Sequence, residues 1–257
     1  MKLKIDNKSK KDLFVSLFQT LKNCTNIISV IFYSNYIHIQ GMDKTHVCLF
    51  DLNIDEKWFD EYSNNKQQVV NFDTNIFYNI ISYNQDNSHL IIEYTDNDED
   101  NMHIDIVFDE KTLTHFDKHF KLPLVDYDNE LFKLPTTEYD AEFVIPSKTI
   151  CEVVSQMSFF GDNLNIKCTE DAVHILANGI SGEMLVDIPI NELNEYSIVE
   201  NEVIDLSYSI HYVHKMCLTN KLSSDIEFSI SSECPMKIKY NLGANSYLTF
   251  FIAPKIS

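Results

Sequence analysis

Residues 28–54 read ISVIFYSNYIHIQGMDKTHVCLFDLNI, and residues 164–190 read LNIKCTEDAVHILANGISGEMLVDIPI. The two stretches align without a gap at a shift of 136 residues, and apolar and polar residues alternate in phase along both. Alternation with a period of two is the pattern of half-buried strands. Five aligned pairs are identical: His38 and His174, Ile39 and Ile175, Leu49 and Leu185, Asp51 and Asp187, Ile54 and Ile190. The sequence therefore predicts an internally duplicated, strand-rich protein.

Helical patterns recur at nearly the same shift. Each has apolar residues spaced for one face of a helix, and the four sets are Leu13, Leu17, Phe18 and Leu21; Ile76, Phe77, Ile80 and Ile81; Ile150, Val153, Val154 and Met157; and Ile210, Val213 and Cys217. Asp73, and Ser147 preceded by Pro146, are signals for a helix start. Each half is predicted as helix, strands, helix, strands. The fold class is α+β, with similar domains over residues 1–119 and 138–257.

A connector, FKLPLVDYDNELFKLPTT, covers residues 120–137 between the two domains. Its two prolines and its central acidic cluster disfavour a long helix or a central strand. Leu131, Phe132 and Leu134 are more apolar than a linker requires, and long connectors in compact proteins are often functional. The pattern alone leaves binding and packing as open alternatives for these residues.

The composition restricts the classes of function. The 257 residues include 39 acids and 20 bases, all lysines, for a formal net charge of −19. This charge argues against a protein that coats nucleic acid over its whole surface, but it leaves room for a basic patch. Five glycines exclude a glycine-rich nucleotide loop and a flexible Gly/Ser linker. The 44% of apolar residues are sufficient for a folded core.

The six cysteines form no CxxC pair, so they are predicted to be reduced thiols of an intracellular protein. No run of 18 apolar residues occurs, and the N-terminal residues lack a hydrophobic signal region. Neither a membrane partner nor a signal peptide is expected. The abundance of asparagine, isoleucine and lysine, without arginine, indicates an AT-rich genome.

Motifs for catalysis or metal binding fail on their spacing. The stretch DNDEDN at 96–101 begins like a calcium loop, but Asn101 replaces the required glycine and Val107 the required glutamate. His115 and His119 lack the glutamate of an HExxH motif. No catalytic residue, metal or cofactor is predicted. A metal-dependent hydrolase using the Asp/His stretch at 96–119 remains the alternative from a different class.

Five segments carry a resemblance to a known family. They are GMDKTHVCLF (41–50), LPTTEYDAEFVIPS (134–147), FGDNLNIKC (160–168), CPMKIKY (234–240) and YLTFFIAPKIS (247–257). Together they resemble the proliferating cell nuclear antigen (PCNA) family of DNA sliding clamps over nearly the full length. The resemblance implies two clamp domains per chain, each with two helices packed on antiparallel sheets. The 136-residue repeat is what such a chain should show.

The family implies that three chains close head-to-tail into a homotrimeric ring around double-stranded DNA. Edge strands near 112–118 and 183–190 would pair between subunits, so that no sheet edge stays open. The interface residues carried over by position are Thr112, Thr114, Phe116, Leu185, Asp187 and Ile188. A subunit of a checkpoint-type heterotrimeric clamp is the closest alternative.

The implied function is that of a DNA polymerase processivity factor, without catalysis. The helices would line the hole and hold DNA independently of its sequence, because phosphate contacts carry no base information. The expected DNA-binding residues are Lys8, Lys10, Lys11, Lys22, Lys148, His211, Lys215 and Lys221. The helix at 75–84 departs from the family pattern, since it has no lysine or arginine.

Polymerases and other replication or repair proteins would dock through short peptide motifs. The family places their aromatic and aliphatic side chains in an apolar pocket beneath the connector, beside extended backbone. The residues carried over are Met42, His46, Val47, Phe132, Leu134, Pro135, Pro235, Phe251, Ile252, Ala253, Pro254 and Ile256. Phe132 is bulkier than the usual leucine and Lys133 is also a departure, so motif preference is expected to differ.

The divergent, arginine-free sequence favours a large DNA virus as the source. A viral clamp would act in the host nucleus or in a cytoplasmic replication factory, whereas a cellular one would act in the nucleus. In either setting the acids are expected on the outer surface. The small lysine set would then face the DNA, and the acidic exterior would repel DNA from other surfaces.

Overall fold

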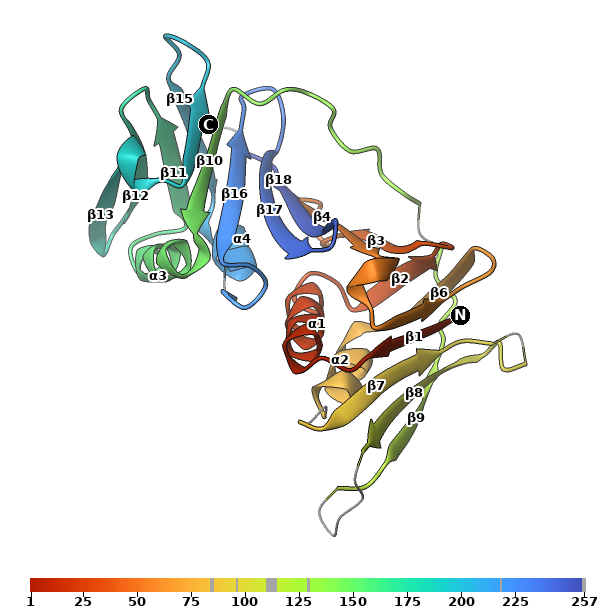
Figure 1. The fold of residues 1–257 in the computed structure, drawn as a ribbon. Helices are drawn as coiled ribbons and strands as arrows, with labels where there is room; N and C mark the ends of the chain where they lie inside the picture. The colour runs from red at the N-terminus through yellow and green to blue at the C-terminus, as the bar shows by residue number, and fades with distance from the viewer. Residues whose placement is uncertain (84–85, 96, 110–114, 129, 218, 256–257) are drawn as a thin grey trace. The chain divides into compact units, whose positions relative to one another are not determined.

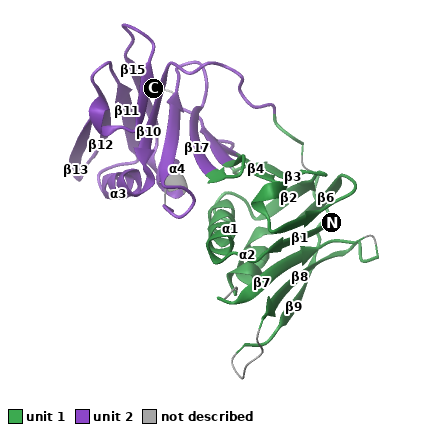
Figure 2. Cartoon of the chain, in the orientation of Figure 1, with its two compact units in different colours: residues 1–44, 51–132, 242–247 green, residues 45–50, 133–241, 248–257 purple. Residues whose placement is uncertain are grey.

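The structure is a computed structural model that describes residues 1–83, 86–95, 97–109, 115–128, 130–217 and 219–255. The chain divides into two compact units (Figure 2). Unit 1 contains residues 1–44, 51–132 and 242–247, and unit 2 contains residues 45–50, 133–241 and 248–257. Among the described residues, no helix is long and apolar enough to cross a membrane.

The first half of the chain, residues 2–123, contains two helices and two runs of hydrogen-bonded strands (Figure 1). The runs have the strand orders β5-β1-β7-β8-β9 and β4-β3-β2-β6. The elements are β1 (Lys2–Ile5), α1 (Lys8–Leu21), β2 (Ile27–Phe32), β3 (Tyr36–Met42), β4 (Cys48–Asp55), the 3-10 helix η1 (Glu56–Trp58), β5 (Glu61–Ser63), β6 (Gln68–Asp73), α2 (Thr74–Ser82), β7 (Ser88–Glu93), β8 (Asn101–Phe108) and β9 (Lys118–Pro123).

The second half repeats this plan, with strand orders β14-β10-β16-β17-β18 and β13-β12-β11-β15. The elements are β10 (Ala141–Pro146), α3 (Ser147–Met157), β11 (Asn163–Cys168), β12 (Ala172–Gly179), β13 (Gly182–Pro189), the 3-10 helix η2 (Ile190–Glu192), β14 (Glu195–Ile198), β15 (Ile204–Ser209), α4 (Ile210–Cys217), β16 (Asp225–Ile230), β17 (Met236–Gly243) and β18 (Ser246–Ile252).

The predicted duplication and the α+β fold class are confirmed. The strands β2 and β11 begin 136 residues apart, as do β3 and β12, β6 and β15, and α2 and α4. Two of the identical pairs in the alignment make the same cross-strand contact in each copy. His38 Nε2 lies 2.7 Å from Asp51 Oδ1, and His174 Nδ1 lies 2.5 Å from Asp187 Oδ1. The structure also places a strand, β1 or β10, before each first helix, which the sequence pattern did not predict.

The helices are held by burial of one face against the sheets. In the first half, α1 and α2 pack side by side (Figure 1). Phe18 of α1, Phe77 of α2 and Phe72 of β6 form one aromatic cluster, with ring centroids 4.5 Å apart for Phe18 and Phe77 and 4.7 Å apart for Phe72 and Phe77. In the second half α3 and α4 pack together, and Val154 and Val213 are fully buried. Burial of this kind stabilises by about 2 kcal/mol per large side chain.

The two predicted helix starts are made differently. Asp73 caps α2 as expected, because its Oδ1 accepts hydrogen bonds from the main-chain N–H groups of Asn75 and Ile76, both at 2.9 Å. Helix α3 does begin at Ser147, but its N-cap is Pro146 and no side chain caps it. The Ser147 hydroxyl donates to the carbonyl of Ser223 at 2.7 Å instead, so it ties the helix start to a neighbouring loop.

The connector is shorter than the sequence suggests. Residues 120–123 belong to the edge strand β9, which ends at Pro123, a residue that edge strands tolerate. Residues 124–128 and 130–139 lie in no helix or strand. The division between the two units falls between Phe132 and Lys133.

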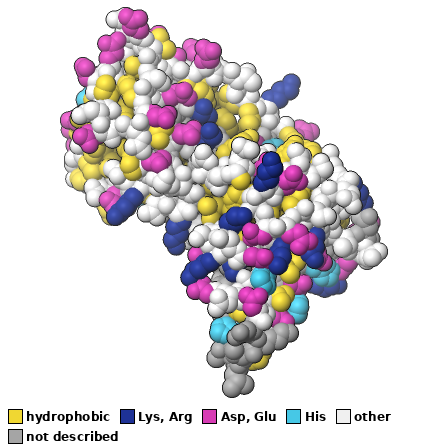
Figure 3. All heavy atoms as spheres, in the orientation of Figure 1, with side chains coloured by type: hydrophobic (Ala, Val, Ile, Leu, Met, Phe, Trp, Pro, Cys, Tyr) yellow, Lys and Arg dark blue, Asp and Glu magenta, His cyan; other side chains and the backbone are white. Residues whose placement is uncertain are grey.

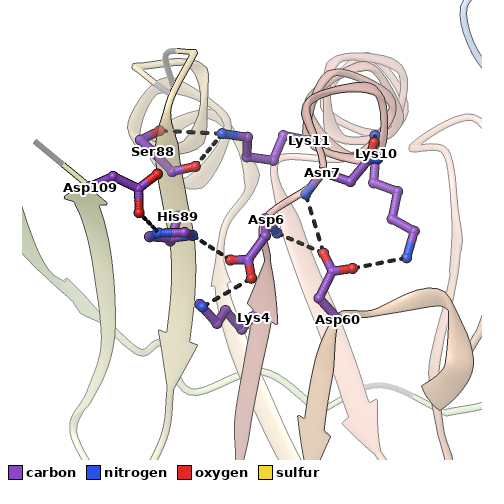
Figure 4. Close-up of polar contacts among 9 residues, drawn as sticks. All are labelled: Lys4, Asp6, Asn7, Lys10, Lys11, Asp60, Ser88, His89 and Asp109. Carbon is purple, nitrogen blue, oxygen red and sulfur yellow. Dashed lines mark hydrogen bonds and ion pairs between the residues drawn. The ribbon is translucent and has the colours of Figure 1, made fainter.

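A polar network fixes the start of α1 (Figure 4). Asp60 Oδ2 accepts from the main-chain N–H groups of Asp6 at 2.7 Å and Asn7 at 3.3 Å, and Lys10 Nζ lies 3.3 Å from Asp60 Oδ1. The ring nitrogens of His89 lie 2.6 Å from Asp6 and 2.6 Å from Asp109. Partial burial raises the pKa of Asp60, but the two main-chain hydrogen bonds and Lys10 outweigh it, so the pKa is below its ordinary value.

This network makes stability depend on pH. A carboxylate with a lowered pKa in the folded chain adds stability above its unfolded pKa of about 3.9, and that stability is lost as pH falls through the folded value. We expect the free energy of unfolding to decrease more steeply below about pH 4 in the wild type than in Asp60→Asn. Urea titrations followed by the fluorescence of Trp58 measure this difference. An equally steep decrease in the free energy of unfolding below about pH 4 in both proteins would contradict this prediction.

Candidate DNA-binding and partner-binding sites

Two lysines on the first turn of α1 are neutralised by carboxylates. Lys8 Nζ lies 2.7 Å from Asp86, and Lys10 Nζ lies 3.3 Å from Asp60 and 5.9 Å from the centre of the Trp58 ring. Figure 3 likewise shows carboxylates next to several lysines on the visible face. The net charge that Lys8 and Lys10 offer to a phosphate is therefore reduced.

Lys11 is not on the surface, and the expectation that it presents its charge to DNA is wrong. Its side chain is 1% exposed, and its ammonium donates to the carbonyl and the hydroxyl of Ser88 (Figure 4). Burial lowers the pKa of Lys11, partly opposed by nearby acids such as Asp86. The residue therefore joins α1 to β7 and serves the fold.

Lys22, just after α1, is placed against α2. Its Nζ lies 3.7 Å from the centre of the Tyr78 ring, a distance suited to a cation–π contact. The lysine-free α2 therefore presents an aromatic ring and one cation beside it. No sequence signal pointed to Tyr78, because a single tyrosine on a helix has no pattern.

The expected cations of the second half have no neutralising partners. Lys148, Lys215 and Lys221 form no ion pair with the described residues, and Lys148 and Lys221 are exposed. Lys215 lies in the last turn of α4, where a positive charge also interacts favourably with the helix dipole. His211 is exposed on the same helix. Among the predicted lysines, those without an ion pair to the described residues are thus Lys22 beside α2, Lys148 on α3, Lys215 on α4 and Lys221 after α4.

Several predicted pocket residues come together in unit 2. The main-chain N–H of Ala253 donates to the carbonyl of Val47 at 3.0 Å, so the C-terminal tail runs beside the 45–50 segment. The N–H of Lys255 donates to the carbonyl of Ser207 at 2.7 Å. The remaining unit 2 residues of the prediction that keep some exposure are His46, Leu134, Pro135, Pro235 and Pro254.

Other pocket predictions need correction. Ile252 is fully buried and Phe251 is 8% exposed, so both side chains belong to the core and offer little surface to a partner. Ile256 lies outside the described residues. Met42 and Phe132 belong to unit 1, where Met42 is half-buried and Phe132 is 41% exposed.

Tyr139 is a site residue that sequence reasoning missed. Its hydroxyl donates to the carbonyl of Pro235 at 3.3 Å. Burial and the nearby Cys234 raise the pKa of this phenol. Tyr139 is half-buried and adjoins the predicted pocket residue Pro235, and Lys237 Nζ lies 4.6 Å from the centre of its ring. Its place in the segment LPTTEYD was the only available signal.

The predicted subunit edges are strand edges in the structure. β13 pairs only with β12, and β9 pairs only with β8, among the described strands. The described edge strand of the first half is β9, at Lys118–Pro123, and Phe116 precedes it with 63% exposure. Thr112 and Thr114 lie outside the described residues.

On β13 the alternation separates two kinds of residue. Leu185 is 53% exposed and Asp187 is exposed beside His174. Ile188, expected at the interface, is only 8% exposed and belongs to the core of its own unit. Leu185 is therefore the apolar residue that this edge presents.

The acidic hairpin near residue 100 is held by its own hydrogen bonds. Asp98 accepts from Lys121 and Asn101, both at 2.7 Å, and from His103 at 2.9 Å, and these contacts hold its pKa well below the usual range. His119 lies 2.7 Å from Asp105. Asp96 lies outside the described residues, and the described residues include no group of three possible metal ligands.

Comparison with known proteins gives the family. The model of the PCNA N-terminal domain matches residues 4–131, and the model of the PCNA C-terminal domain matches residues 133–255. The chain belongs to the proliferating cell nuclear antigen family. The two matched domains coincide with the two halves of the sequence repeat.

Relatives span nearly the whole chain. "Proliferating cell nuclear antigen 2" of Plasmodium falciparum is 28% identical over 252 residues, 95% of this chain and 95% of the relative. "DNA polymerase sliding clamp 3" of Sulfurisphaera tokodaii is 24% identical over 251 residues, 95% of this chain and 96% of the relative. The crystal structure of PCNA from Thermococcus kodakaraensis has the same fold, with a TM-score of 0.87, 19% identity and 99% of both chains covered.

The separate roles of the α1 lysines in this PCNA-family chain can be measured. Lys11→Ala removes a buried stem and its hydrogen bonds to Ser88, so we expect a decrease of about 2 kcal/mol in the free energy of unfolding. The matched change Lys8→Ala removes an exposed ion pair that water screens, so it should cost much less than Lys11→Ala. Urea unfolding of both variants provides the test. Equal costs would show that Lys11 is not structural.

Proposed function

We propose that this chain is a DNA sliding clamp that encircles duplex DNA and tethers a DNA polymerase and other replication or repair proteins, without catalysing a reaction. The observation that carries the proposal is the duplicated unit with an open sheet edge in each copy, on a chain of the PCNA family. Unpaired edges invite strand addition from another chain. β9 of one copy would pair with β13 of the next.

Three chains would close such a ring. The two edges are different surfaces, so their contact is heterologous. A heterologous contact closes into a ring only when the rotation between neighbouring copies divides a full turn into a whole number of copies. The exposed Leu185 on β13 would be buried by the neighbouring copy. A heterotrimeric assembly predicts instead that the purified chain stays monomeric.

The DNA contact in this proposal is electrostatic and loose. Lys148, Lys215 and Lys221 have no carboxylate partner among the described residues, whereas Lys8 and Lys10 do. Lysine is a point charge without the bidentate geometry of arginine, so it holds phosphate without fixing a register. The second unit would therefore supply most of the contact with phosphates.

The partner site in this proposal is the apolar surface around the C-terminal tail. Val47 and Ala253 fix that tail by a main-chain hydrogen bond of 3.0 Å. Leu134, Pro135, Pro235 and Tyr139 belong to the same unit and keep partly exposed surface. Apolar anchors of a short peptide, with adjacent extended backbone, suit such a surface.

The oligomeric state tests the ring. We expect a molar mass three times the 29.9 kDa of one chain for the wild type, and a monomer for Leu185→Asp. A carboxylate buried without a partner at the interface would disfavour assembly. The control is Val69→Asp, because Val69 is 50% exposed on β6, a different strand from β9 and β13.

Sedimentation equilibrium gives the mass of each protein. A wild type that remains at 29.9 kDa at all concentrations would refute the homotrimer. If Val69→Asp is also a monomer, the effect of Leu185→Asp is not specific to the proposed interface. Circular dichroism of each variant must match the wild type, so that loss of the fold is excluded.

Charge reversal tests the DNA surface. Lys148→Glu with Lys215→Glu should weaken duplex binding and reduce the salt slope by about 0.9 for each phosphate that the protein no longer neutralises. Lys8→Glu should have a smaller effect, because Asp86 already neutralises that lysine. Fluorescence anisotropy with a labelled duplex, over a series of salt concentrations, measures both. Equal effects of the two reversals would contradict the assignment to the second unit.

A further inference from the structure

Hydrogen bonds fix the described part of the connector to unit 1 in two regions, near residues 124–127 and at Phe132. At the first, the N–H of Val125 donates to the carbonyl of Asn71 at 2.9 Å, and the Asn71 side chain donates to the carbonyl of Tyr127, also at 2.9 Å. At the second, Phe132 is held by Gln40. Between these points, Asp128, Glu130 and Leu131 make no hydrogen bond with the described residues. The position of Leu131 and Phe132 therefore depends on the second point.

Gln40 binds the connector as a neighbouring strand would. Its Oε1 accepts from the main-chain N–H of Phe132 at 2.6 Å, and its Nε2 donates to the carbonyl of Phe132 at 3.1 Å. Both main-chain groups of Phe132 are thus satisfied by one side chain. Gln40 is 4% exposed, so these bonds are shielded from water, while the Phe132 ring stays 41% exposed.

A buried carboxylate fixes the orientation of Gln40. Its Nε2 also lies 3.3 Å from Asp51 Oδ1, and His38 Nε2 lies 2.7 Å from the same oxygen. A carboxylate only accepts hydrogen bonds, and the Phe132 N–H only donates, so only one orientation of the Gln40 amide satisfies both. Asp51 is 2% exposed, and a buried carboxylate requires such partners.

The sequence repeat supplies an internal comparison. The second copy keeps the pair, as His174 and Asp187, but Leu176 stands where the first copy has Gln40. Leucine has no donor or acceptor in its side chain, so the second pair ends without a link to another segment. The link through Gln40 is therefore particular to the half of the chain that carries the connector.

We infer that Gln40 is a positioning residue for partner binding: held by Asp51 and His38, it fixes Phe132 so that Leu131 and Phe132 present their exposed side chains in one arrangement. The inference rests on the proposed function for the identity of the partner, a peptide with apolar anchors. Without Gln40 the connector would sample more conformations, and a partner would have to order it on binding.

Amide hydrogen exchange tests whether Gln40 holds the main chain of Phe132. Gln40→Met keeps the length of the side chain and removes both hydrogen bonds, so the amide of Phe132 should exchange about tenfold faster or more. The amide of Val125, bonded to the main chain of Asn71, should keep its rate. Mass spectrometry of peptic peptides that contain each residue measures both. An unchanged rate for Phe132 would overturn the inference.

Two further variants test the separate contributions of His38 and Gln40. His38→Ala removes the residue that contacts Asp51 and not Phe132, so it should accelerate exchange at Phe132 less than Gln40→Met does. The matched control, His174→Ala, breaks the equivalent pair of the second copy and should leave the Phe132 amide unchanged. An equal effect of His174→Ala would show general destabilisation and overturn the specific link.

The effect on a partner is measured with a fluorescein-labelled synthetic peptide that carries one leucine and two adjacent phenylalanines. Gln40→Met should weaken its binding about tenfold. Faster exchange with unchanged peptide affinity would overturn the positioning role and leave the proposed pocket standing. If the wild type does not bind the peptide, the proposed partner pocket is wrong. The exchange rate of the Phe132 amide would still show whether Gln40 holds the connector.

Discussion

The packing of paired short helices against antiparallel sheets is the interaction on which the rest of this structure depends. The helices have 14, 9, 11 and 8 residues, lengths that are marginal in water on their own. Burial of Phe18, Phe77, Val154 and Val213 therefore decides that they form and which face they turn to the sheets. Every charge that they present elsewhere is positioned by that packing.

The same constraint explains how an acidic chain could hold DNA. The lysines of α1 are either paired with carboxylates or, in the case of Lys11, buried in the fold. Those at α3 and α4 have no acidic partner among the described residues. An overall charge of −19 thus leaves a few lysines on or beside the helices without a carboxylate partner among the described residues.

Much of this architecture could be predicted from the sequence, because duplication and periodicity are local signals. The four helices and the repeated strands follow from them. The burial of Lys11 was missed although a signal existed, since residues 11, 14, 18 and 21 share one helical spacing. A lysine at such a position is predicted to be exposed unless a buried hydrogen-bond acceptor, here Ser88, is known. The core position of Ile188 was missed for a related reason, because the inward face of an edge strand is set by its register.

Contacts between distant residues could not be predicted. Gln40 and Phe132 are 92 positions apart, and no local pattern joins a glutamine of a strand to the main chain of a connector. Tyr139 and Tyr78 are similar cases, where a single aromatic residue gains its role only from the fold. The family resemblance supplied the candidate pocket residues by position, and the structure separates the exposed ones from Ile252, which is buried.

Encirclement is the central claim, and one measurement tests it directly. The protein is incubated with linear duplex DNA that has biotin at both ends, streptavidin is added to half of the sample, and both halves are washed at high salt. A closed ring that threads onto DNA should stay on the end-blocked molecules and slide off the open ones, because topology holds it where electrostatic attraction is screened. Equal loss from both, or equal retention on both, would contradict the account.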